Sequence, residues 1–464
     1  MTYRLAELEV PTDDPFRNDA LDRRQVVEFL SGLIARTGGP FVLALDSPWG
    51  SGKTTLVRML KADLERQNFQ CIHFNAWRVD HAVDPLVALV SSVDRVQLAA
   101  GASQAKFDQH VKTIRKVTSL VAKRGAVAIA KALTAGALDL DKEIEDAAAE
   151  LTGGAVEDIV AAFRKEAELL EKFRAELQSA VALLPESGKE PTLVWFIDEL
   201  DRCRPTFAVE LLERMKHLFD VQDVVFVLSL DKRQLEASTA AVYGSDIDAT
   251  EYLRRFIDLE YGIPLATTVR FTESLLTRFD LDRVFAERKG EVAQDKRHFV
   301  EFFTAIADLF ALSLRARERC ITRLRVVMDQ TPSNHYLEPI LVALLLVLRS
   351  NAVDVFWGLV RGETSPEEVM TRLRGLPRAK GLLNNRVEVI LEAYLIASDP
   401  DDKRVEARNA RLNAVAADEH PDREERARAR KLLEVHRCVG GRWGQGLSLK
   451  FVAGKIDLAS AIRE

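Results

Sequence analysis

The sequence predicts an α/β fold: a three-layer α/β/α arrangement around a parallel sheet, with a large helical insertion and an all-α C-terminal region. Three observations support this prediction. Short apolar runs end in polar or acidic residues, which is typical of strands buried in a parallel sheet. Segments with helical spacing alternate with these runs, as in βαβ units. Beyond about residue 266, nearly all of the chain has helical spacing.

The first expected elements are a helix, a strand, a second helix and a second strand. Residues 18–36 have helical spacing, and the apolar run 41–45 follows them. Residues 54–67 restore the helical spacing, and residues 70–80 supply the second strand. Trp77, at the end of that strand, is expected to be a buried anchor with its indole N–H satisfied locally.

Three further strands are expected after a long helical stretch. Residues 192–205 begin as a strand and run into acidic residues, and residues 223–231 form another apolar run. A fifth strand is expected within residues 256–265. Together with the first two, these strands would complete a parallel sheet.

Changes in amino-acid composition along the chain predict three domains. Residues 86–189 are rich in alanine, lysine and glutamate, so we expect a helical insertion there. The core would then be discontinuous, with residues 1–85 and 190–266. Residues 267–464 would form the helical C-terminal region. Their longest apolar run, residues 340–348, is too short to cross a bilayer, so no membrane span is expected.

The composition is that of a globular protein with reduced thiols. Of 464 residues, 47% are hydrophobic, enough for two or three compact units. The formal net charge of -6 argues against a wholly basic nucleic-acid binder. The four cysteines are too scattered for a paired-cysteine zinc pattern and too few for a disulfide scaffold, which favours a cytoplasmic protein.

A phosphate-binding loop is predicted between the first strand and the second helix. The stretch "SPWGSGKTT" offers Gly50 and Gly52, whose freedom lets the backbone curl around phosphates. Lys53 can reach the β- and γ-phosphates, and Thr54 is placed to ligate Mg²⁺. The predicted ATP-binding residues are Ser47, Pro48, Trp49, Gly50, Ser51, Gly52, Lys53, Thr54 and Thr55.

Two positions in this loop raise questions. Ser47 stands where the strict pattern has its first glycine. Serine is acceptable there because close approach to the phosphates concentrates at the two later glycines. Trp49 either covers the phosphates or packs the loop against its neighbours, and the sequence does not distinguish these alternatives.

An acidic pair follows the third strand. Asp198 and Glu199 come directly after the apolar run "LVWFI", and the carboxyl end of such a strand faces the ligand in an open parallel sheet. Asp198 is predicted to hold Mg²⁺ together with Thr54, and Glu199 to activate the attacking water. Adenine is the expected base, since no Asn/Thr-Lys-x-Asp motif follows an apolar strand.

Phosphoryl transfer also needs positive charge on the γ-phosphate, often from an arginine of a neighbour or second domain. Arg254 and Arg255, before the last strand, and Arg315, in the helical region, are candidates. Each could equally belong to a solvated helix face. Ser229 and Asp231 could sense the γ-phosphate, with helix capping by Asp231 as the alternative. The predicted catalytic residues are Glu199, Lys53, Arg254 and Arg255.

These motifs resemble the KAP family of P-loop NTPases, a branch of the additional-strand ATPase class. The resemblance rests on "DPFRNDALDR", "PWGSGKT", "FNAW", "IDELDRCRP" and "YLRRFIDLEYGIP". It implies phosphate and magnesium binding by the loop, a Walker B role for Asp198 and a catalytic base in Glu199. Arg254 or Arg255 falls where the family's presumed arginine finger lies. Ser47 replaces the family's usual glycine, and the insertion lacks the membrane helices that many members carry.

The leading hypothesis is a Mg²⁺-dependent ATPase that couples its nucleotide state to homo-oligomerisation or to a partner protein. The resemblance to soluble bacterial members associates it with defence against phages. The alternative is a nucleotide-dependent switch or scaffold with negligible turnover.

A third hypothesis is that the arginine-rich C-terminal helices bind nucleic acid. Against it, acidic residues interleave with the basic ones, for example in residues 423–431, which is typical of a salt-bridged exposed helix. No aromatic residues for base stacking are interleaved there.

Overall fold

The computed structural model describes most of the chain. The described residues are 3–82, 84–96, 98, 102–134, 168–216, 220–264, 268–287, 292–332, 337–383, 385–399, 401–417, 422–443 and 449–457. The predicted insertion at residues 86–189 is therefore described only in part, because residues 135–167 lie outside these ranges.

The chain forms two compact units. The first, which we call the sheet unit, comprises Leu8–Asp19 and Arg23–Leu265. The second, the helical unit, comprises Met1–Glu7, Ala20–Asp22 and Ala266–Glu464. Each unit has its own apolar core.

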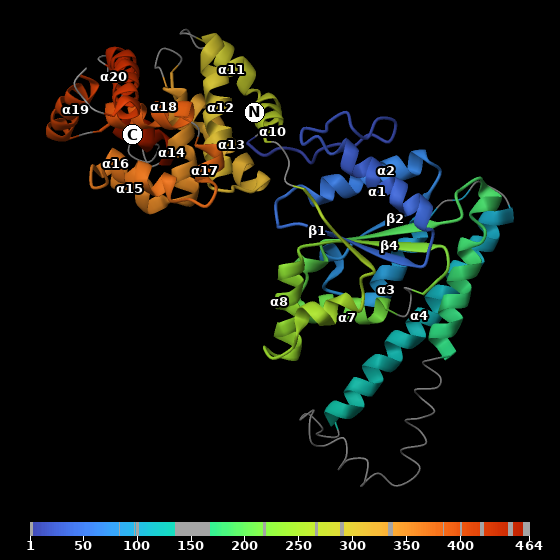
Figure 1. Cartoon of the computed structure of the whole chain (residues 1–464). Helices are drawn as coiled ribbons and strands as arrows, with labels where there is room; N and C mark the ends of the chain where they lie inside the picture. Colours follow the sequence, from blue (N-terminus) through green and yellow to red (C-terminus); the bar gives the residue numbers. More distant parts are fainter. Residues whose placement is uncertain are drawn as a thin grey trace. The chain divides into compact units, whose positions relative to one another are not determined.

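The sheet unit is built on five parallel strands in the order β2-β3-β4-β1-β5 (Figure 1). The strands are β1 (Phe41–Asp46), β2 (Gln70–Asn75), β3 (Leu193–Asp198), β4 (Val224–Leu230) and β5 (Leu259–Gly262). Four of them fall within predicted segments, and β1 extends one residue beyond its predicted run of 41–45. One strand, β4, lies between β1, which precedes the predicted phosphate loop, and the acidic strand β3.

Helices cover both faces of this sheet. They are α1 (Arg24–Thr37), α2 (Lys53–Arg66), α3 (Pro85–Val90), α4 (Ala102–Thr134), α7 (Pro205–Met215), α8 (Lys232–Tyr243) and α9 (Ala249–Arg254). Successive residues of β3 point to opposite faces: Phe196 belongs to the core cluster that includes α1 and α2, whereas Trp195 belongs to the cluster that includes α3, α4 and α7. The predicted three-layer α/β/α fold is confirmed.

The helical unit contains helices and no strand within the residues described. Its helices are α10 (Val269–Arg278), α11 (Leu281–Glu287), α12 (Val292–Leu309), α13 (Leu314–Asp329), α14 (Pro339–Asn351), α15 (Val353–Arg361), α16 (Pro366–Arg374), α17 (Ala379–Leu382), α18 (Asn385–Ala397), α19 (Asp402–Ala416), α20 (Arg423–Trp443) and α21 (Leu449–Asp457). Every residue from 339 to 348 in α14 is buried, so the apolar run is the centre of a helix bundle. No helix in the described ranges has the length and apolar character needed to span a membrane.

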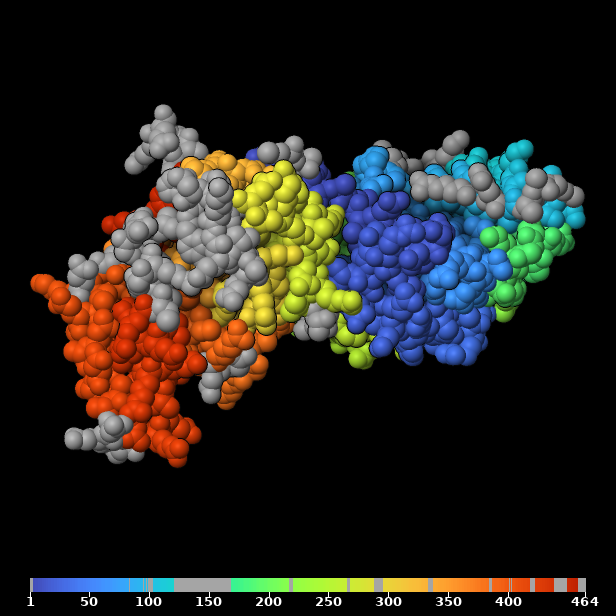
Figure 2. All heavy atoms as spheres, turned by 90° about the horizontal axis from the view of Figure 1, so that it is seen from above, coloured from blue at the N-terminus to red at the C-terminus, as the bar shows by residue number. Residues whose placement is uncertain are grey.

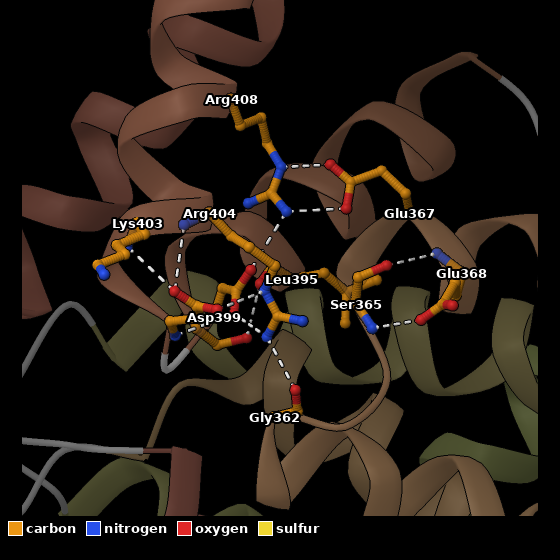
Figure 3. Close-up of polar contacts among 11 residues, drawn as sticks. Gly362, Ser365, Glu367, Glu368, Leu395, Asp399, Lys403, Arg404 and Arg408 are labelled. Carbon is orange, nitrogen blue, oxygen red and sulfur yellow. Dashed lines mark hydrogen bonds and ion pairs between the residues drawn. The ribbon is translucent and has the colours of Figure 1, made fainter.

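A buried carboxylate fastens α19 to the rest of the helical unit (Figure 3). The fully buried side chain of Asp399 accepts hydrogen bonds from Arg404 Nη2 (2.9 Å) and Arg408 Nη2 (3.2 Å), both on α19. Arg408 Nη2 also donates to Glu367 Oε2 on α16 at 2.8 Å. Two charged groups of α19 are therefore paired with carboxylates from neighbouring segments.

Trp77 corrects one sequence-based prediction. It was expected to be buried, but its side chain is 51% exposed and lies in a 3₁₀ turn, Trp77–Val79, beyond the end of β2. The guanidinium of Arg202 lies over the indole, 5.8 Å from the ring centroid. The prediction was wrong because β2 ends at Asn75 and the chain then turns along the surface.

Candidate nucleotide-binding site

The loop between β1 and α2 has the backbone that a phosphate-binding loop requires. Gly50 has φ of 78° and Gly52 has φ of 89°, both in the left-handed region that favours glycine. Gly52 is the N-cap of α2, and Lys53 is the first helical residue. The unpaired N–H groups of the first turn of α2 are thus available at the end of the loop.

Ser47 fits its position without the freedom of glycine. Its side chain is 4% exposed, and it is not among the described non-glycine residues with positive φ. Its N–H donates to the carbonyl of Leu230 at 3.2 Å, and its own carbonyl accepts a hydrogen bond from Lys53 Nζ. Because the backbone here is not left-handed, a side chain at this position costs no conformational strain.

Trp49 ties the loop to the ends of two other strands. Its backbone N–H donates to Asp231 Oδ2 at 3.0 Å, and its indole Nε1 donates to Asp201 Oδ2. Asp231 occupies the N-cap position of α8 but makes no capping hydrogen bond with its side chain, so the capping alternative is wrong. Asp201 was not predicted, although it follows Asp198 by only three residues in the same acidic stretch.

Several carboxylates surround the lysine of the loop. Burial lowers the pKa of Lys53, and the nearby carboxylates of Asp201, Asp231, Asp46 and Asp198 oppose that shift without cancelling it. Burial also raises the pKa of Asp201, against the opposing effects of Lys53 and Trp49. These carboxylates come from the ends of β1, β3 and β4 or just beyond them, so the lysine lies where the strand ends converge.

Asp198 ends β3 and is only 1% exposed. Its neighbour in the strand register on one side is Asn75, and on the other side it is Ser229. Burial alone would raise the pKa of Asp198, but the polar groups of His73, Ser229 and Thr54 outweigh it and hold the pKa below its ordinary value. The structure therefore brings Thr54 and Asp198, the two predicted magnesium residues, close together.

The surroundings of Asp198 fit a bound divalent cation. Within the described residues, Asp198 Oδ2 and Ser229 Oγ are buried and have no hydrogen-bond partner. Ser51 Oγ, in the loop, is in the same condition. His73 Nε2 lies 3.6 Å from Asp198 Oδ2, too far for a hydrogen bond. Hydroxyl and carboxylate oxygens of this kind are the ligands that Mg²⁺ prefers. Most buried polar atoms in proteins have a hydrogen-bond partner, so these unpartnered oxygens are consistent with a site for a bound cation.

Glu199 adopts a strained backbone and is held by two donors. Its φ of 61° is left-handed, which costs about 1–3 kcal/mol in a residue other than glycine. Its carboxylate accepts a hydrogen bond from Asn75 Nδ2 at 2.7 Å and another from Arg202 Nη1. Neither donor was predicted as a site residue; the parallel register, which pairs Asn75 with Asp198, explains how the first comes to lie there.

The predicted finger arginines are at the surface. Arg254, in α9, is 63% exposed and forms an ion pair with Glu251 of the same helix. Arg255, at the C-cap of α9, is also exposed. In the described ranges, no hydrogen bond or ion pair joins either arginine to the loop or the acidic pair. Arg315 belongs to the helical unit.

The fold and the site define a P-loop NTPase: a glycine-rich loop and an acidic strand end meet at the carboxyl edge of a parallel sheet. The family comparison specifies this class further. Residues 23–330 match the KAP family P-loop domain, which is more than half of the chain. The chain therefore belongs to the KAP family, and it is a nucleotide-binding NTPase.

Other comparisons add little. The search of curated proteins gives no match. Among solved structures, the chain is similar to the ORC2 protein of Aeropyrum pernix, in a structure described as its ADPNP-ADP complexes. The identity is 13%, 95% of each chain is covered, and the TM-score is 0.36. A similarity this low carries no weight in the assignment.

Proposed function

We propose that the protein is a Mg²⁺-dependent ATPase whose nucleotide state is coupled to homo-oligomerisation or to a partner protein. One observation carries this proposal: Lys53 and Thr54 of the loop lie beside Asp198, with Glu199 directly after it. Phosphate-binding and metal-binding groups separated by more than a hundred residues of sequence therefore share one site.

In this proposal the loop N–H groups and Lys53 bind the ATP phosphates. Thr54 and Asp198 hold Mg²⁺, which, when bound, neutralises the charge that develops on the phosphates. The buried and unpartnered oxygen of Asp198 supports this assignment. Asp231 and Asp201 keep the loop in place through the two hydrogen bonds of Trp49.

Glu199 is the proposed general base. Asn75 and Arg202 both donate to its carboxylate, and these two contacts fix its position directly after Asp198. The two donors bind different oxygens of the carboxylate, and each oxygen keeps a second lone pair that can accept a proton from water. The same contacts support the alternative of a nucleotide switch with negligible turnover, in which Glu199 stays engaged.

The exposure of Arg254 and Arg255 supports the coupling to assembly. Within the described residues, neither arginine forms a hydrogen bond or ion pair with the loop or the acidic pair, which supports the supply of an arginine by a second copy or a partner. The free, buried thiols of Cys71, Cys203 and Cys320 support a reducing compartment such as the cytoplasm. A role in phage defence rests on the family resemblance, and plaque counts with the wild-type chain and Lys53→Ala test it.

The Glu199→Gln variant separates the enzyme from the switch. With the base removed, we expect ATP affinity within about twofold of wild type and hydrolysis lowered by about 10²–10⁴-fold. Phosphate release and equilibrium ATP binding measure the two effects. In native mass measurements, ATP should increase the oligomer mass of this variant. Wild-type protein that binds Mg-ATP but releases no phosphate, alone or at high concentration, would instead favour the switch.

A further inference from the structure

One side of α20 carries a stripe of arginines. Arg423, Arg426, Arg430 and Arg437 are spaced by three, four and seven residues. At 100° per residue, these four positions lie within about 60° of one another around the helix. The stripe extends along about 21 Å, taking 1.5 Å per residue. The red residues of this helix lie at the surface in Figure 2.

The acidic residues that interleave with this stripe in the sequence mostly lie on other sides of the helix. Glu424 and Glu425 are about 100° and 200° away from Arg423. Both of their backbone N–H groups donate to Asp422 Oδ1, at 2.8 and 3.0 Å, at the start of the helix. Glu434 is the exception, about 20° from Arg423. The sequence-based objection to a basic surface therefore does not hold for this helix.

The stripe borders a hollow of about 420 Å³. Four cationic side chains line it, together with one carboxylate and one alanine, and no aromatic residue is among them. The lining residues are Arg423, Arg426, Ala427, Arg430, Lys431 and Glu434. Cations thus outnumber carboxylates by four to one in a chain whose overall charge is negative.

The rest of α20 is used to hold this surface in place. Ala429 and Leu432 are buried, and Arg428 Nη2 donates to Glu388 Oε1 on α18 at 2.9 Å. Arg430 Nε donates to the carbonyl of Ala416, at the end of α19, at 2.9 Å. This bond joins Arg430, which lines the hollow, to the end of α19. The cations are therefore presented by a packed helix whose other sides are anchored.

We propose that this hollow of α20 binds the phosphate backbone of double-stranded nucleic acid. A guanidinium matches two phosphate oxygens at once, and a straight row of such groups fits the regular phosphates of a duplex. The absence of aromatic lining argues against single strands, which bind largely through base stacking. Contacts to phosphates alone predict binding that is independent of sequence and strongly dependent on salt. The inference does not depend on ATP hydrolysis.

The test is a fluorescence anisotropy titration. A labelled DNA duplex of about 25 base pairs and arbitrary sequence, about two helical turns long, is titrated with the full chain in the absence of nucleotide. The titration is repeated over a range of salt concentrations. Four phosphate contacts predict a slope of about -3 to -4 for log K against log salt concentration. Replacing Arg423, Arg426 and Lys431 by Gln should weaken binding at least tenfold and move the slope toward about -1. Arg430 is left unchanged because it also caps α19.

A matched control carries the same charge change elsewhere in the helical unit: Arg283→Gln, Arg361→Gln and Arg372→Gln, three exposed arginines on α11, α15 and α16. This control should retain the wild-type affinity and slope. Circular dichroism checks that both triple variants are folded, and Lys431→Gln alone should still reduce the slope by about one.

Three results would overturn the proposal. The first is no binding at low salt, and the second is an equal loss in the control variant. The third is tighter binding to polyglutamate or to single-stranded DNA of matched length, which would assign the surface to an acidic protein or to single strands instead.

Discussion

At the scale of single residues, the hydrogen bond from Trp49 to Asp201 leads to a prediction that the phosphate-loop motif alone does not give. Trp49→Phe keeps an aromatic ring but removes the indole N–H, leaving the buried carboxylate of Asp201 without that donor. We expect a loss of about 1–3 kcal/mol in the free energy of unfolding and about tenfold weaker ATP binding, because the loop loses one of its ties. Thermal unfolding and ATP titration measure the two effects.

Trp77→Phe is the matched control, since Trp77 is half exposed in the same unit. Its substitution should change stability by less than about 0.5 kcal/mol and leave ATP affinity unchanged. Equal behaviour of the two variants would contradict the role given to Trp49.

The sequence motifs predicted the positions of Lys53 and Asp198, because each position is set by the secondary structure of the residues directly beside it. Lys53 begins a helix after a left-handed glycine, and Asp198 ends an apolar strand. Asn75 could not be predicted, because its contact with Glu199 spans 124 residues and arises from the register between β2 and β3. The surroundings of Trp77 depended likewise on where a strand ends, which the sequence does not mark sharply.

At the scale of helices and strands, the sequence predicted all five strands, and the apolar runs of β1 to β4 correspond to strands that are mostly buried in the parallel sheet. Boundaries were less predictable. β5 is only Leu259–Gly262, an edge strand paired with β1 alone and largely exposed, so its ends lack the apolar signal. α1 begins at Arg24 because the carboxylate of Asp19 accepts the N–H groups of Arg23 (2.6 Å) and Arg24 (3.0 Å), a local arrangement that competes with helix.

The attachment of α19 gives a prediction at this scale. Asp399→Asn preserves the shape of the side chain but removes the charge that Arg404 and Arg408 share. Breaking a buried ion pair of this kind costs about 3–5 kcal/mol. Because Arg404 is partly exposed, we expect the free energy of unfolding to fall by about 3 kcal/mol. Chemical denaturation of the full chain measures it.

Asp401→Asn provides the control for this substitution. Asp401 is half exposed and caps α19 through the N–H groups of Lys403 and Arg404, and asparagine caps helices equally well. Its change should cost less than about 1 kcal/mol. A loss that small for Asp399→Asn would show that the buried carboxylate does not fasten α19.

At the scale of the whole molecule, the two units divide the work that we propose. The sheet unit holds the candidate ATP site and the exposed arginines of α9, whereas the helical unit carries the stripe of α20. The sequence predicted a helical C-terminal region. It did not predict that the arginines of α20 gather on one side of the helix, because neighbours in the sequence point to different sides of a helix.

The account depends most on a single site in which Lys53 and Asp198 act on one Mg-ATP. Equilibrium ATP titration of the full chain, with and without Mg²⁺, tests this directly in the wild type, Lys53→Ala and Asp198→Asn. We predict that Lys53→Ala weakens ATP binding at least 100-fold, about 2.7 kcal/mol. Asp198→Asn should remove most of the Mg²⁺ dependence while leaving metal-free binding intact. Unchanged ATP affinity in Lys53→Ala, or undiminished Mg²⁺ dependence in Asp198→Asn, would contradict the account.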